Sequence, residues 1–105
     1  MFAVIYRFTV HTGQDESFQE AWGELTNLIH RHEGSLGSRL HRESEGNYIA
    51  YAQWPDRQTW EGSGDKLPAE ADGWRQQMRA SCEKIETLHT LDMTDDLLQE
   101  RTYLP

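Results

Sequence analysis

Cysteine is almost absent from this chain, since Cys82 is the only one among its 105 residues. An intramolecular disulfide therefore cannot form, which is typical of proteins that fold in a reducing compartment. No apolar run is long enough to cross a bilayer, and residues 1–10 lack the basic segment and cleavage pattern of a signal peptide. These absences predict a cytoplasmic protein that makes no use of a membrane.

Positive charge is also scarce. Lysine and arginine together number 10, against 18 aspartates and glutamates, and the formal net charge is -8. The basic residues are scattered singly, so we expect no surface that binds the phosphates of a nucleic acid or an anionic membrane. The acidic balance excludes those partners and does not by itself indicate a chemistry.

Several cofactor motifs are missing as well. Gly62-Ser63-Gly64 is not followed by the Gly-Lys-Ser/Thr of a phosphate-binding loop, and no dinucleotide fingerprint occurs. The histidines are spread over different segments and the carboxylates lack paired ligand spacing, so no metal site is predicted. His30 and His32 point in different directions on a helix, so we interpret them as imidazoles next to its partially negative C-terminal end rather than as a metal pair.

What the sequence does contain is alternating and helical hydrophobic patterning. Residues 2–10 are rich in aromatic and β-branched side chains and predict a strand whose even-numbered residues face the helices. Residues 15–32 carry apolar side chains at helical spacing, which predicts an amphipathic helix that ends at Gly34. Thr12 or Asp15 is the expected N-cap of this helix.

A hairpin and further elements complete the pattern. Strands are predicted over residues 36–43 and 48–54, because turn residues separate them. A second helical region starts after the third strand; a helix over residues 69–81 and a last strand over residues 85–93 follow. This β-α-β-β-α-β order predicts an α+β, ferredoxin-like fold, a four-stranded antiparallel sheet with the helices on one face.

The length fits one domain, residues 1–105. The second face of the predicted sheet has no cover within the chain, although it includes Ala3 and Ile5. An uncovered apolar face needs a partner, so we expect a homodimer through this open sheet face, which would close an α/β barrel. The tail, residues 94–105, is a candidate arm that crosses to the second copy.

Two segments carry a resemblance to a known family. His32–Arg42 and the strand Tyr48–Trp54, followed by Pro55-Asp56 and Trp60, resemble the antibiotic biosynthesis monooxygenase family. Its members often have an acidic residue or Pro before Gly, then a small-apolar-Gly strand, and a strand that ends in Trp before a short helix. The resemblance covers most of residues 1–93. It implies a dimeric α/β barrel and a cofactor-independent monooxygenase acting on a small aromatic or quinol-like substrate.

Haem degradation occurs in the same family and is a weaker alternative here. Haem-degrading members place an Asn on the first strand, a Trp on the helix after the third strand and a His on the following helix. Here Tyr6 stands at the Asn position and Ser63 near the Trp position, and no His occurs from Pro55 to Leu88. The proximal haem ligand is therefore missing. A non-enzymatic dimer that binds a small apolar molecule is the other alternative, because a fold does not define a function.

Polar side chains on the strands are the candidate catalytic groups. His41 is a candidate base for removing a phenolic proton, because an unperturbed imidazole titrates near neutrality, and Tyr51 is its neighbour if the hairpin is short. A polar patch at a dimer interface or a solvated sheet edge is the more common role of such groups, as a core is of buried aromatic residues. The predicted catalytic residues are Tyr6, His41, Tyr51 and His89; the predicted substrate pocket adds Trp60, Trp74 and Arg39; no cofactor is predicted.

Overall fold

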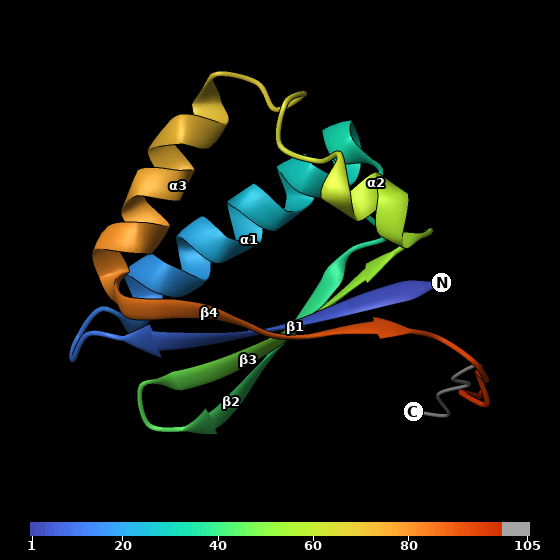
Figure 1. Ribbon diagram of the computed structural model, residues 1–105. Helices are drawn as coiled ribbons and strands as arrows, with labels where there is room; N and C mark the ends of the chain where they lie inside the picture. The colour runs from blue at the N-terminus through green and yellow to red at the C-terminus, as the bar shows by residue number, and fades with distance from the viewer. Residues whose placement is uncertain (100–105) are drawn as a thin grey trace, which may run out of the picture.

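The helices and the sheet form two layers in the computed structural model, which describes residues 1–99 (Figure 1). The strands are all antiparallel, and their order across the sheet is β2-β3-β1-β4. The predicted ferredoxin-like α+β fold is confirmed, with the second helical region divided in two. The elements are β1 (Phe2–Val10), α1 (Asp15–Glu33), β2 (Ser38–Ser44), β3 (Asn47–Trp54), α2 (Arg57–Glu61), α3 (Glu70–Ser81) and β4 (Cys82–Asp92).

Two predicted details of these elements are corrected, the start of β4 and the N-cap of α1. The strand β4 begins at Cys82 rather than at Ile85, because the backbone of Cys82 already pairs with Val10 of β1. The N-cap of α1 is Gln14, without a side-chain hydrogen bond. Asp15 does not cap the helix, since its carboxylate accepts a hydrogen bond from the Tyr48 hydroxyl at 2.5 Å.

The end of α1 follows the prediction. Gly34 takes a left-handed conformation with φ 83°, which a residue without Cβ adopts at little cost. Among the described residues, no helix has the length and the apolar content that a membrane span requires.

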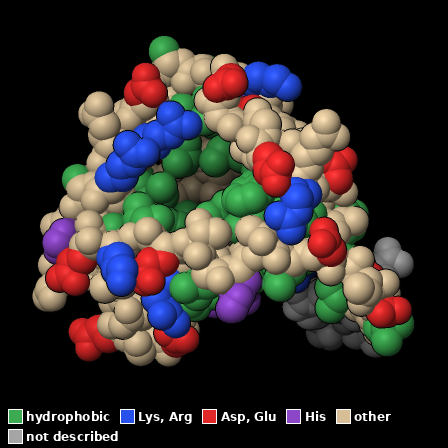
Figure 2. Space-filling view, in the orientation of Figure 1, with side chains coloured by type: hydrophobic (Ala, Val, Ile, Leu, Met, Phe, Trp, Pro, Cys, Tyr) green, Lys and Arg blue, Asp and Glu red, His purple; other side chains and the backbone are tan. Residues whose placement is uncertain are grey.

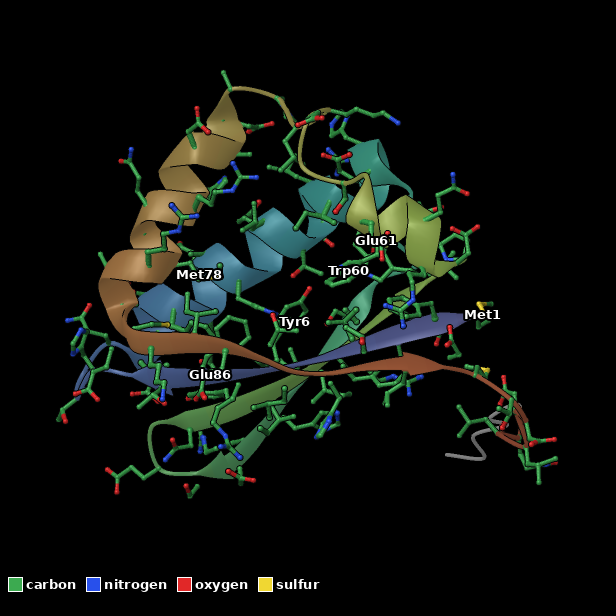
Figure 3. All side chains as sticks on the ribbon, in the orientation of Figure 1. Met1, Tyr6, Trp60, Glu61, Met78 and Glu86 are labelled. Carbon is green, nitrogen blue, oxygen red and sulfur yellow. The ribbon has the colours of Figure 1, made fainter. Side chains whose placement is uncertain are left out.

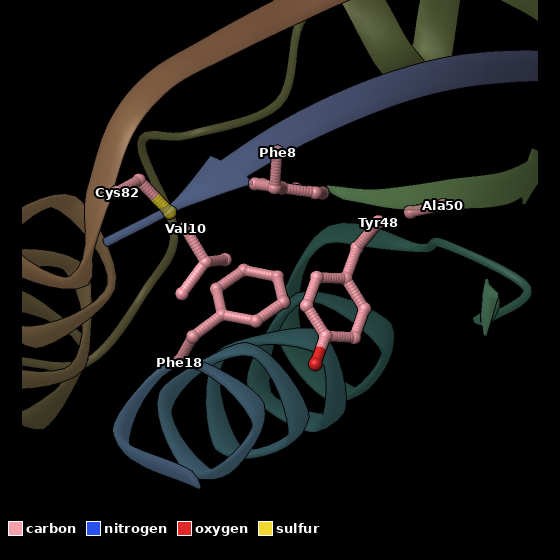
Figure 4. Packing of buried hydrophobic residues seen from close by; sticks show 6 residues of the cluster. All are labelled: Phe8, Val10, Phe18, Tyr48, Ala50 and Cys82. Carbon is pink, nitrogen blue, oxygen red and sulfur yellow. The ribbon is translucent and has the colours of Figure 1, made fainter. Parts of the chain in front are cut away.

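An aromatic stack fixes α1 on the sheet (Figure 4). The ring of Phe18, which is 0% exposed, lies 5.0 Å from the ring of Phe8 on β1 and 5.0 Å from the ring of Tyr48 on β3. Tilted aromatic pairs at this separation add to the stabilisation from buried area. The stack therefore holds one end of α1 against the sheet and leaves the other end free to diverge.

The two faces of the sheet differ in what covers them. On the covered face, β1 places Val4, Tyr6 and Phe8 under the helices, as the alternation predicts. On the open face, Ile5 pairs with Tyr51, and Arg7 pairs with Ile49. No helix or loop among residues 1–99 covers this open face (Figure 1).

The tail follows β4 along the edge of the sheet. Thr94–Gln99 form no helix or strand, and Leu97 and Leu98 are largely exposed. The rest of the predicted arm, residues 100–105, lies outside the described residues.

Candidate functional site

A cavity of about 510 Å³ lies between the covered face of the sheet and the helices α1 and α3. Its volume is within the range of sites that bind small molecules. Figure 2 shows the hollow from its open side, with hydrophobic side chains in its interior. The apolar wall consists of Tyr6, Phe8, Trp22, Leu25, Ile29, Ala52, Trp54, Met78 and Ile85.

The cavity lies where small side chains on the covered face meet the part of α1 that rises away from the sheet (Figure 1). The aromatic side chains of the strands are Tyr6 and Phe8 on β1 and Trp54 on β3, and the small ones between them are Ala52 on β3 and Ser38 on β2. The helices therefore rest on the aromatic groups at one end, and space remains above the small residues. Met78 closes the cavity from α3 (Figure 3).

Tyr6 is the polar group of the wall whose hydrogen bonding is best defined. The indole Nε1–H of Trp60 donates to the Tyr6 hydroxyl at 3.1 Å (Figure 3). A tyrosine hydroxyl both donates and accepts, so the proton of Tyr6 is left for another acceptor. Burial raises the pKa of Tyr6 above its usual 10.0, and the bond from Trp60 offsets this in part. The phenol is thus a neutral hydrogen-bond donor at physiological pH.

Two arginines lie in the wall on the α3 side. Arg75 and Arg79 are one helical turn apart and both line the cavity, as residues four apart share a helix face. Figure 2 shows basic side chains along this side of the hollow. Arg75 Nη1 lies 3.8 Å from the Asp72 carboxylate, whereas Arg79 forms no ion pair with any described carboxylate. No Asp, Glu or His is among the lining residues.

The structure divides the predicted catalytic residues between the two faces of the sheet. Tyr6 lines the cavity, whereas His41, Tyr51 and His89 lie on the open face, where His41 pairs with Ile49 and His89 with Ile5. Alternate strand residues point to opposite faces. Within one chain, these three residues therefore cannot contact a ligand that Tyr6 touches, so the four predicted residues do not form one site. Their part in catalysis stays a prediction.

The predicted pocket residues also lie elsewhere. Trp60 supports Tyr6 from behind and packs on Phe2, with ring centroids 5.6 Å apart. Trp74 packs against the hydrophobic cluster of Leu25, Leu28 and Ala71, where α1 and α3 meet. Neither lines the cavity, and Arg39 lies on the open face, paired with Tyr51.

The sequence predicts only Tyr6 among the lining residues, and four of the others are instructive. Trp22 belongs to the apolar stripe of α1, and its place beside a cavity depends on where the helix diverges from the sheet. Trp54 ends β3, and its buried Nε1–H has no hydrogen-bond partner among the described residues. Arg75 and Arg79 did carry a signal, because two cations four residues apart flank the apolar Met78 on one helix.

Metal-binding groups do not gather around the cavity. In residues 1–99, no three side chains of His, Cys, Asp or Glu come close enough to hold an ion. The side chains that could contact a ligand are instead apolar rings, hydroxyls and guanidinium groups. Such a wall suits a flat apolar molecule with few polar substituents.

By its fold and its cavity, the protein is a ferredoxin-like domain with room for an aromatic ligand between the sheet and the helices. The chain belongs to the antibiotic biosynthesis monooxygenase family, whose model matches residues 1–65. No protein of curated function matches the sequence.

Solved structures show the same fold. One is SnoaB from Streptomyces nogalater, a cofactor-independent oxygenase, with 19% identity, a TM-score of 0.73 and coverage of 93% of this chain and 97% of that one. Another is a Nitrosomonas europaea protein assigned to the same family, with 16% identity, a TM-score of 0.70 and coverage of 89% and 98%. Rv0793 from Mycobacterium tuberculosis has 15% identity, a TM-score of 0.68 and coverage of 92% and 98%.

Proposed function

We propose that this protein is a cofactor-independent monooxygenase that oxidises a small, flat aromatic or quinol-like molecule in the cavity beneath its helices. The observation that carries the proposal is the apolar cavity of about 510 Å³ into which Tyr6 presents a phenol with an unused proton. Membership of the family supports the same reaction type. SnoaB, which shares the fold, is described as a cofactor-independent oxygenase.

The proposed reaction uses O₂ and the substrate alone. A quinol ring exchanges one C–H for C–OH and is oxidised to the hydroxyquinone, and the second oxygen atom leaves as water. All electrons that reduce O₂ come from the quinol. Because no carboxylate or imidazole lines the cavity, the ring hydroxyl transfers its proton to water. Tyr6 then donates a hydrogen bond to the resulting anion.

The test is oxygen consumption with a panel of naphthoquinols and related polycyclic phenols. A Met78→Trp variant enlarges a side chain in the wall and should abolish turnover with every member of the panel. Gln76→Trp makes the same insertion on the exposed side of α3 and should leave turnover unchanged. Equal loss in both variants, or none in Met78→Trp, would place the reaction outside the cavity.

Binding without turnover is the second candidate, and a specific observation favours it. The absence of Asp, Glu and His from the lining residues leaves the described part of the chain without a general base in the cavity. A ligand that titrates into the cavity without oxygen consumption would select this alternative. Haem has less support, since the lining offers no imidazole as an axial ligand.

We further propose that two copies pair through the open sheet face. This face carries Ile5, Ile49 and Leu91, the last 46% exposed, without cover among residues 1–99. Apolar groups gathered on an uncovered face favour association. In this arrangement His41, Tyr51 and His89 belong to the interface between copies. Sedimentation equilibrium should give twice the chain mass of 12.3 kDa.

A further inference from the structure

The charge of the cavity wall differs from that of the rest of the chain. The formal net charge is -8, with 18 acidic residues against 10 basic ones. The cavity nevertheless contains two arginines and no acidic residue among its lining side chains. An acidic protein that presents only positive charge to an apolar cavity repels anions over most of its surface and attracts them at this place.

The two arginines lie at the entrance of the cavity rather than in its interior. The hollow opens on the side that carries α3 and β4, and basic side chains lie along its α3 side (Figure 2). Arg79 is exposed and Arg75 half-buried, whereas Trp54 and Phe8 in the wall are buried. The cavity is thus apolar inside and cationic at its entrance, which suits a molecule with a ring system at one end and an anionic group at the other.

The guanidinium group pairs with oxyanions, both carboxylates and phosphates. Its planar N–H groups match the two oxygens of a carboxylate. Arg75 shares its charge with Asp72 at 3.8 Å, whereas Arg79 has no ion-pair partner among the described residues. Arg79 is therefore the principal donor, and Arg75 supports it from the preceding turn.

We propose that the preferred ligand of the cavity is an aromatic carboxylate, whose ring lies beneath the helices and whose carboxylate binds Arg79 and Arg75 at the entrance. The inference rests on the proposed function, since it names the substrate class of the same site. The cavity should therefore bind aromatic carboxylates more tightly than neutral aromatic compounds of equal size and shape.

Isothermal titration calorimetry with naphthalene-2-carboxylate and naphthalene-2-carboxamide tests the proposal without requiring turnover. The two probes have the same ring and differ in charge. The wild-type protein should bind the carboxylate about tenfold more tightly, the scale of a charge-assisted pair. Addition of salt should reduce this preference, because the entrance is open to solvent.

Variants assign the preference to its residues. Arg75→Gln/Arg79→Gln should bind both naphthalene probes equally, whereas Arg79→Lys should keep part of the preference. Arg31→Gln removes the same charge from an exposed position of α1 that does not line the cavity, and it should behave as wild type. Thermal unfolding should show that all variants fold.

The outcomes separate this inference from the proposed function. Binding of both probes with equal affinity overturns the inference and leaves the cavity as a ligand site. A preference that survives in the double variant also overturns it. Failure of both probes to bind also overturns the inference, and oxygen consumption with the quinol panel then decides whether the proposed function stands. Tight carboxylate binding without oxygen consumption supports the inference and favours the binding alternative over the enzyme.

Discussion

Replacing Tyr6 with Phe removes one oxygen atom from the cavity wall and leaves the ring in place. The lost interaction is the hydrogen bond from Trp60 Nε1 at 3.1 Å, a neutral pair that is half-buried. Such a bond contributes about 0.5–1.5 kcal/mol to folding. Domains of this size are stable by about 5–15 kcal/mol, so the Tyr6→Phe protein should remain folded at 25 °C.

The effect on turnover should be much larger than the effect on folding. If the Tyr6 hydroxyl donates to the substrate oxyanion, its removal should lower kcat by about 10²–10³, as for other single donors of this kind. If the hydroxyl only accepts the hydrogen bond from Trp60, the folded fraction hardly changes and turnover stays at the wild-type level. The two roles therefore predict results that differ by about two orders of magnitude.

Steady-state oxygen consumption with a substrate from the quinol panel, measured beside urea unfolding, distinguishes these roles. Tyr48→Phe is the matched control, because Tyr48 also lies on the covered face. Its hydroxyl donates a hydrogen bond to the Asp15 carboxylate, and Tyr48 does not line the cavity. Tyr48→Phe should lose stability and keep its kcat. A Tyr6→Phe enzyme that turns over at the wild-type rate would refute the assignment of Tyr6 as the oxyanion donor.

Three further predictions concern stability. Phe18→Ala removes the centre of the aromatic stack and should destabilise the protein by about 3–5 kcal/mol in urea unfolding, with Phe18→Leu clearly milder. The Glu33 carboxylate accepts the backbone N–H groups of Gly64 at 2.7 Å and Lys66 at 3.1 Å; Glu33→Ala should cost about 1–2 kcal/mol, and exposed Glu24→Ala almost nothing. Burial raises the pKa of the Cys82 thiol from 9.0 to about 11, so the folded state favours the protonated form. Unfolding free energy should fall as pH rises from about 9 to about 11, a slope that Cys82→Ala should lack in unfolding experiments across this range.

Local pattern determines most of the fold. The alternation in residues 2–10 assigns the covered face of β1 correctly, because successive side chains of a strand point to opposite faces and Val4, Tyr6 and Phe8 pack in the core clusters under the helices. The helical stripe with Gly34 after it defines α1 to within one residue. The start of β4 was missed because Cys82 continues the apolar spacing of α3, and only its pairing with Val10 decides between helix and strand.

The site depends on long-range geometry that a periodic pattern does not contain. Alternation places Tyr6 on the covered face, but the sequence alone left open which face His41 and Tyr51 occupy. The register settles this point, since Tyr6 pairs with Ala50 on one face and Ile5 with Tyr51 on the other. The cavity itself arises where α1 diverges from small residues on β2 and β3, which no local motif encodes.

Dimerisation and ligand binding should be separable, and this consequence can be tested on the open face. The cavity lies on the covered face of the sheet, whereas the proposed interface lies on the open face, so a single copy should hold a complete site. Ile49→Asp places a charge on the open face beside Arg7, away from the cavity lining. Burying a carboxylate between two copies is unfavourable even with Arg7 beside it, because both charges lose their hydration, so sedimentation should show a monomer.

The Ile49→Asp monomer should still bind naphthalene-2-carboxylate with the wild-type affinity in calorimetry, because the wall of the cavity is unchanged. Loss of binding together with loss of the dimer would mean that the second copy contributes to the site. The open-face residues His41, Tyr51 and His89 would then be its first candidates, since a partner seated on this face contacts them directly. Retained binding would assign those residues to association alone and leave the chemistry to Tyr6 and the arginines at the entrance.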